Sequence, residues 1–102
     1  MSEFSLHTVK GISRLLVGNT VDPDRLHFHI SEIEPGTRAH PPHTHEGIEA
    51  FYVFEGEGIV EMGEERQPVH ANEAVVIDAG VLHGLVNTGQ TRMRYMVIIV
   101  KD

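Results

Sequence analysis

The sequence predicts an all-β domain, a sandwich or barrel of roughly eight to ten short strands. Short segments rich in apolar and β-branched residues recur along the chain, and turns that contain glycine separate them. No segment has the apolar periodicity of an amphipathic helix. Closing so small a sheet into a barrel or jelly roll would also remove exposed strand edges, which a β-protein must protect.

The first clear strand is expected at Leu26–Ile33, where apolar and polar residues alternate. The apolar residues at positions 26, 28 and 30 share one face of this strand. His27 and His29 share the other face, and we expect them to face solvent or an interface rather than a cavity. Glu34-Pro35-Gly36 then ends the strand.

Six more strands are expected further along the chain. They are Gly47–Phe54, Ile59–Met62, Arg66–His70, Ala74–Ile77, Leu82–Val86 and Met93–Val100. The last one is apolar at every position from Tyr95 to Val100, so both of its faces should avoid water. One face can fill the core. No predicted helix can cover the other, so the sequence predicts a homodimer.

Length and composition restrict the function classes. The 102 residues suit one domain spanning residues 1–102. A net charge of −7, from 15 acidic and 8 basic residues, argues against nucleic acid and membrane surfaces as partners. Cysteine is absent, which excludes thiolate metal sites and a cysteine nucleophile. We see no signal peptide and no apolar segment of about 20 residues, so a cytoplasmic location is expected.

Histidine is enriched, with eight residues, and the spacing of three of them indicates a metal site. His43 and His45 are one residue apart, so on a strand they would point to the same face. Glu49 has the same parity and adds a carboxylate, and His83 follows a glycine turn later in the chain. Three imidazoles and one carboxylate suit one divalent transition-metal ion (Mn, Fe, Co, Ni, Cu or Zn) better than Mg or Ca.

These residues resemble the two motifs of the cupin superfamily, specifically its small single-domain members of the cupin-2 conserved-barrel type. The first motif covers residues 36–56, with Gly36, His43-Thr44-His45, Glu49 and Gly56 in place. Its one departure is six rather than five residues between Gly36 and His43.

The second motif covers residues 72–87 and contains His83 and Asn87. Asn72 stands where the motif has glycine, and Asp78 where it has proline; both are turn positions rather than ligands. The resemblance implies a double-stranded β-helix (jelly-roll) barrel. The metal would be held inside it by His43, His45, Glu49 and His83, and the barrel mouth would be open to small molecules.

Two function classes remain open at this stage. The resemblance implies an enzyme, an isomerase, lyase, decarboxylase or dioxygenase, acting on a small organic acid, sugar acid or dicarbonyl. The alternative is a non-catalytic cupin that binds a metal or a small molecule as a sensor or accessory protein. A closed structural zinc site is a related possibility, although histidines mixed with glutamate at a barrel mouth favour an open one.

An acid–base group beside the metal would favour the enzyme. The candidates are His40, Arg38, Tyr52 and Tyr95, and none of them has a spacing argument behind it. Phe51 shares the parity of Glu49, so it should line the cavity or pack in the core.

Overall fold

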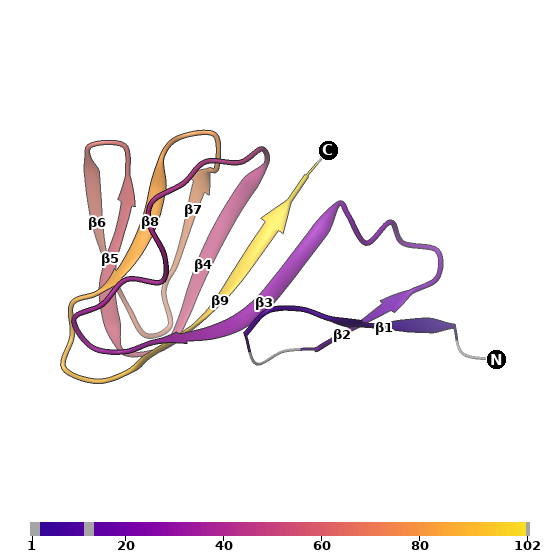
Figure 1. Cartoon of the computed structure of the whole chain (residues 1–102), viewed down its shortest axis with the longest axis horizontal. Coiled ribbons are helices and arrows are strands. Elements are labelled where there is room, and N and C mark those ends of the chain that lie inside the picture. Colours follow the sequence, from indigo (N-terminus) through magenta and orange to yellow (C-terminus); the bar gives the residue numbers. More distant parts are fainter. Residues whose placement is uncertain (1–2, 12–13, 102) are drawn as a thin grey trace.

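The computed structural model describes residues 3–11 and 14–101, and this part of the chain contains strands but no helix (Figure 1). The strands are β1 (Phe4–Thr8), β2 (Arg14–Gly18), β3 (Leu26–Ile33), β4 (Ile48–Glu55), β5 (Glu57–Met62), β6 (Glu65–His70), β7 (Ala74–Asp78), β8 (His83–Asn87) and β9 (Met93–Val100). The predicted all-β class is therefore confirmed. Strands β3 and β9 have the predicted bounds, and the other five predicted strands shift by one or two residues.

Two antiparallel sheets form the barrel, one with the order β3-β9-β4-β7 and one with the order β6-β5-β8. Their inner faces meet in one apolar cluster. Its buried members are Ile33, Phe51, Val53, Val60, Val69, Ile77, Leu85, Met93, Tyr95 and Val97. Because both sheets contribute to this cluster, its burial holds the barrel closed.

The polar face of β3 points into the barrel, and the outward placement predicted for His27 and His29 is therefore wrong. Strand β9 pairs with β3 and sets its orientation: His27 lies opposite Ile99, and His29 lies opposite Val97. Paired residues share a face of the sheet, and Val97 is buried in the core. His29 is only 2% exposed as a result, whereas Phe28 is 37% exposed.

The outer face of the four-stranded sheet is apolar across its full width. The pairing register places Phe28, Ile98, Ala50 and Val76 in one row, one residue from each strand. Val76 is 67% exposed. In the same register Val100 lies between Leu26 and Ile48, and all three residues are exposed. The second apolar face of β9 expected from the sequence is thus present.

Strands β1 and β2 form a separate two-stranded hairpin that extends away from the barrel (Figure 1). This hairpin is not among the strands predicted from the sequence. Its tip returns to the barrel at Gly11, which has a φ of +83° and packs against β3. A Cβ atom at this position would collide with the carbonyl oxygen of Ile30, so only glycine permits the approach.

The described residues include no helix that is long and apolar enough to cross a membrane.

Candidate metal centre

His83 is the most constrained residue of the site. It opens β8 and is 1% exposed. Its Nδ1 lies 2.8 Å from the carbonyl oxygen of Val81, which can only accept, so we assign the ring proton to Nδ1. The lone pair is then on Nε2, which has no hydrogen-bond partner within the described chain although Oε2 of Glu49 lies 3.4 Å away. A buried lone pair aimed at a carboxylate calls for a cation between them.

His45 repeats this arrangement on the other side of the carboxylate. Its Nδ1 lies 3.0 Å from the carbonyl oxygen of Glu46, and its Nε2 lies 2.8 Å from Oε1 of Glu49. Glu49 is 3% exposed, so its charge needs compensation. A proton on His45 or a metal ion at Nε2 would each provide it.

His43 and His45 lie in the segment before β4. They are not on a regular strand, so the strand geometry predicted for the pair is wrong. His43 forms an isolated antiparallel bridge with His83, in which each backbone N–H donates to the other carbonyl at 3.0 Å. Between His45 and β4 the chain turns at Gly47, with a φ of +102° and its backbone against Val100. The turn and the bridge, rather than strand parity, aim these rings at Glu49.

The ring of His43 stacks on His40 at a centroid distance of 4.3 Å, and their Nδ1 atoms are 3.1 Å apart. With its ring proton on Nδ1 and directed at His40, neutral His43 keeps its lone pair on Nε2, which can then bind a metal. Burial, followed by the nearby imidazoles of His40 and His83, lowers the pKa of His43. The neutral form, which is the form that ligates metals, is therefore favoured at neutral pH.

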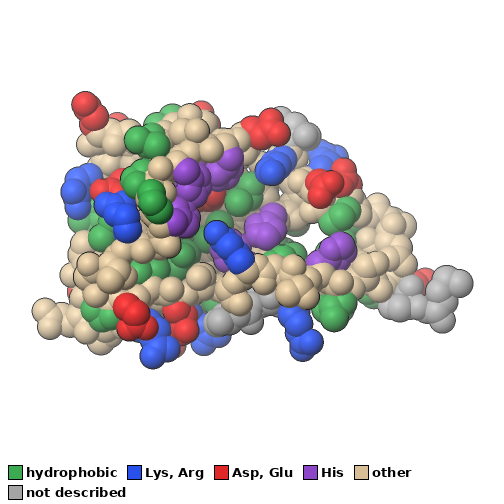
Figure 2. Space-filling model, viewed as in Figure 1, with side chains coloured by type: hydrophobic (Ala, Val, Ile, Leu, Met, Phe, Trp, Pro, Cys, Tyr) green, Lys and Arg blue, Asp and Glu red, His purple; other side chains and the backbone are tan. Residues whose placement is uncertain are grey.

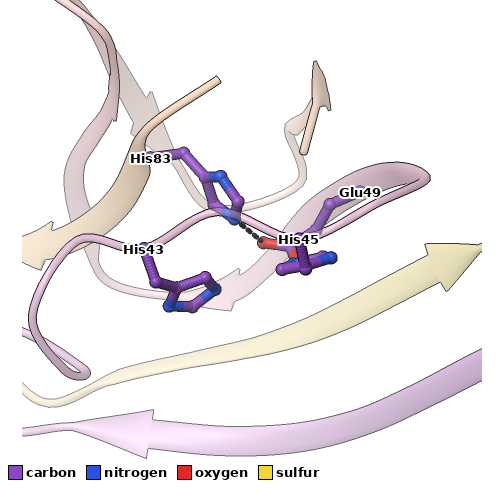
Figure 3. Close-up of side chains that lie close together, drawn as sticks. All are labelled: His43, His45, Glu49 and His83. Atoms are coloured by element: carbon purple, nitrogen blue, oxygen red, sulfur yellow. Dashed lines mark hydrogen bonds and ion pairs between the residues drawn. The ribbon is translucent and has the colours of Figure 1, made fainter. Parts of the chain in front are cut away.

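The four predicted ligands come together in one cluster (Figure 3). One ligand atom from each of His43, His45, Glu49 and His83 lies within 4.8 Å of the other three. Metal–nitrogen and metal–oxygen bonds of about 2.1 Å place neighbouring ligands roughly 3–3.5 Å apart, so small adjustments suffice. The donor set fits a divalent transition metal, and the cluster could hold one.

The cluster opens into a cavity of about 230 Å³. His43, His45 and Glu49 line it, together with an apolar wall of Phe51, Leu85, Val97 and Ile99. The remaining lining residues are Lys10, His27, His29, Ala39, His40 and Tyr95. Figure 2 shows histidine side chains gathered around a hollow in one face, with Lys or Arg side chains at its edge. This volume accommodates only a small molecule.

Two of the four acid–base candidates, His40 and Tyr95, line this cavity. Burial raises the pKa of Tyr95, which is 4% exposed and forms a hydrogen bond with Ser31, so its hydroxyl keeps its proton. Arg38 instead pairs with Glu61 at 2.8 Å. Tyr52 lies on the other face of β4 from Phe51, with its ring 5.2 Å from Phe54. Neither Arg38 nor Tyr52 lines the cavity.

Three further cavity residues, Lys10, His27 and His29, were not singled out as site residues from the sequence. The i, i+2 spacing of the two histidines was visible and resembles that of His43 and His45. Nothing in the sequence indicated that this face of β3 is the inner one. No sequence pattern indicated Lys10 as a cavity residue, because its position depends on how the hairpin folds back onto the barrel.

Comparison with known proteins agrees with this architecture. Residues 29–99 match the family model described as Cupin domain. An oxalate-binding protein from Thermotoga maritima is 32% identical over 59 residues, which make up 57% of this chain and about half (49%) of that protein.

Two solved structures show the same fold. One, from Thermotoga maritima and described as a predicted oxalate decarboxylase, has a TM-score of 0.66 and 30% identity over 72% of this chain and 64% of that chain. The other, a cupin protein from Bacteroides fragilis, has a TM-score of 0.75 and 16% identity over 99% of this chain and 86% of that chain. With the family match, the all-β barrel and the two motifs in place, this chain belongs to the cupin family and has the fold of a small cupin-2 domain.

Proposed function

We propose that the chain binds one divalent transition-metal ion through His43, His45, Glu49 and His83 and acts as a metal-dependent enzyme on a small organic acid. One observation carries the proposal. The rings of His83 and His45 each have Nδ1 against a backbone carbonyl oxygen and Nε2 directed at the same buried carboxylate. This arrangement preorganises lone pairs and one negative charge around a single point.

The chain's own residues divide the remaining work. A bound divalent ion supplies a Lewis acid for the oxygens of a carboxylate or carbonyl group. The contact of His40 with His43 fixes the orientation of that ring. Tyr95 lines the cavity and keeps its hydroxyl proton, so it is suited to donate a hydrogen bond. The apolar wall excludes water and strengthens these polar interactions.

The comparisons suggest the compound to try first. The two matches from Thermotoga maritima carry the descriptions oxalate-binding and predicted oxalate decarboxylase, at 32% and 30% identity. Oxalate offers two adjacent carboxylates and is small enough for a cavity of about 230 Å³. The description of the first relative also supports the second candidate function, in which the chain binds the acid without turnover, as a sensor or accessory protein.

A single assay separates the two candidates. The protein loaded with manganese, iron or zinc is incubated with oxalate, with hydroxy acids, with sugar acids and with dicarbonyl compounds. Consumption is followed by NMR and binding by calorimetry. We expect turnover of one class that stops on chelation. Binding with no product from any class would support the non-catalytic function, and neither binding nor turnover would contradict both.

We further propose that the outer face of the four-stranded sheet is the interface of a homodimer. Exposure of this apolar face to water would cost free energy, and a second copy of the chain offers the same apolar surface to cover it. The face includes the row of Phe28, Ile98, Ala50 and Val76. Light scattering at micromolar concentration should give the mass of a dimer. The variant Val76→Lys, which places a charge on this surface, should give a monomer. A monomeric mass for the wild type would contradict the proposal.

The cytoplasmic location and the organisation of residues 1–102 as one domain stay predictions. Cell fractionation and limited proteolysis, respectively, would test them.

A further inference from the structure

We propose that Lys10, His27 and His29 form a second binding pole of the cavity, opposite the metal centre, and that the chain therefore takes short-chain dicarboxylates. One carboxylate of the ligand would lie at the metal centre and the other at this pole, which we call the distal pole. The inference rests on the proposed function, because it deepens the description of the same cavity.

The pairing register fixes the distance between the two poles. Glu49 on β4 lies opposite Ile99 on β9, and Ile99 lies opposite His27 on β3. Neighbouring strands are about 4.8 Å apart, so the backbones at Glu49 and His27 are separated by roughly 10 Å. Both side chains project to the inner face, where each lines the cavity. A ligand of a few carbon atoms therefore suffices to reach from one pole to the other.

The surface between the poles is apolar. Ile99 separates Glu49 from His27, and in the next row Val97 separates Phe51 from His29. All of these residues line the cavity. A polar wall would suit a ligand with oxygens along its length, such as a sugar acid. Two polar poles on either side of an apolar strip suit a ligand with oxygens at its ends and methylene groups between them.

The two histidines of the distal pole form a pair. Nε2 of His27 lies 2.9 Å from Nδ1 of His29, so one proton joins the two rings. Burial, and then the charge of Lys10, lowers the pKa of His29 to about 4. Burial, then the charges of Lys10 and Lys101, lowers the pKa of His27. Both rings are neutral at pH 7 as a result. They can share hydrogen bonds with a ligand, while Lys10 supplies the positive charge.

Lys10 reaches the cavity because the hairpin tip is anchored on β3. Gly11 packs so closely on the Ile30 carbonyl that no side chain fits, and a Cβ atom there would lie 3.6 Å from Cδ2 of His29. This contact holds Gly11, the residue that follows Lys10, beside the histidine pair. Lys10 is one of only two lysines in a chain with a net charge of −7. A cation that lines the cavity is therefore not expected from the overall composition.

The test compares three ligands on two charge-matched variants. Oxalate, succinate and butyrate are titrated by calorimetry into zinc-loaded wild type, Lys10→Met and Lys101→Met. Lys101 is the matched control, since it lines the neighbouring hollow beside His27 but does not line the cavity itself. We expect succinate to bind wild type more tightly than butyrate does. Lys10→Met should weaken succinate about tenfold, as for loss of one charge-assisted hydrogen bond. Oxalate affinity should stay within about twofold in both variants, because oxalate lies at the metal centre alone.

The outcomes separate this inference from the proposed function. If succinate bound wild type and Lys10→Met equally well, or if both lysine variants lost the same affinity, the distal pole would be overturned. Oxalate binding in the same experiment would still support the metal centre. Failure of wild type to bind zinc or oxalate would instead contradict the proposed function. The distal pole would then be judged by NMR of the metal-free protein. Shifts of the His27 and His29 ring signals with succinate would support it, and their absence would overturn it.

Discussion

Substitution of His83 by alanine is expected to abolish stoichiometric metal binding, with a loss of affinity on the order of 100-fold or more. Residues that merely orient a metal ligand already contribute about 10–100-fold, so removal of a ligand should cost at least as much. The substitution also leaves Glu49 buried with one imidazole fewer beside it. Elemental analysis of protein purified without added metal, together with zinc titration, gives the measurement.

The control is His70→Ala. His70 is an exposed histidine at the end of β6, away from the cluster, so its loss should leave the metal content unchanged. Circular dichroism shows whether both variants keep the β-sheet signal. Equal metal in wild type and His83→Ala would refute the site, because adventitious binding to exposed histidines would then explain the metal.

Replacement of Asn87 by alanine is expected to lower the free energy of unfolding by about 3 kcal/mol. Asn87 is fully buried at the end of β8, and its side chain joins the end of β3 to the loop between β8 and β9. Its Nδ2 donates to the carbonyl oxygens of Ile33 and Thr91 at 2.9 Å, and its Oδ1 accepts from the backbone N–H of Gly89 at 2.9 Å. Alanine would leave these groups without partners and create a cavity.

Urea denaturation followed by circular dichroism measures this loss. Gln90→Ala removes an exposed side-chain amide from the same turn and should change the stability by less than about 0.5 kcal/mol. A loss below about 1 kcal/mol for Asn87→Ala would mean that water or a local shift replaces its hydrogen bonds. The side chain of Asn87 would then contribute little to the stability of this turn.

Much of the fold could be predicted from the sequence because its signals are local. Alternating apolar residues gave β3 its bounds, and the run from Tyr95 to Val100 located β9. Asp78 was read as a turn residue, and its Oδ1 indeed accepts the backbone N–H of Gly80 at 2.9 Å. The four candidate ligands could be proposed because His43, His45 and Glu49 share one parity over seven residues, and because His83 follows a glycine turn at the spacing of the second motif.

The inner and outer faces of β3 could not be assigned from its own residues. Alternation shows that two faces differ, but which one enters the core depends on the partner strand, here β9. His29 consequently lies inside although its apolar neighbour Phe28 lies outside. The hairpin of β1 and β2 escaped prediction for a related reason. Its position involves a close approach of Gly11 to β3, which no local pattern reveals.

The anchored hairpin tip has a consequence for how this chain can change over evolutionary time. The proposed metal centre and the one cation of the proposed distal pole lie in parts of the sequence that can vary separately: residues 43–83 contain the metal cluster, whereas Lys10 belongs to a hairpin outside the two barrel sheets. Exchange of Lys10 for another residue alters neither the core nor the ligands of the cluster. Descendants of one ancestral barrel could thus acquire new preferences for small acids through the first strands alone.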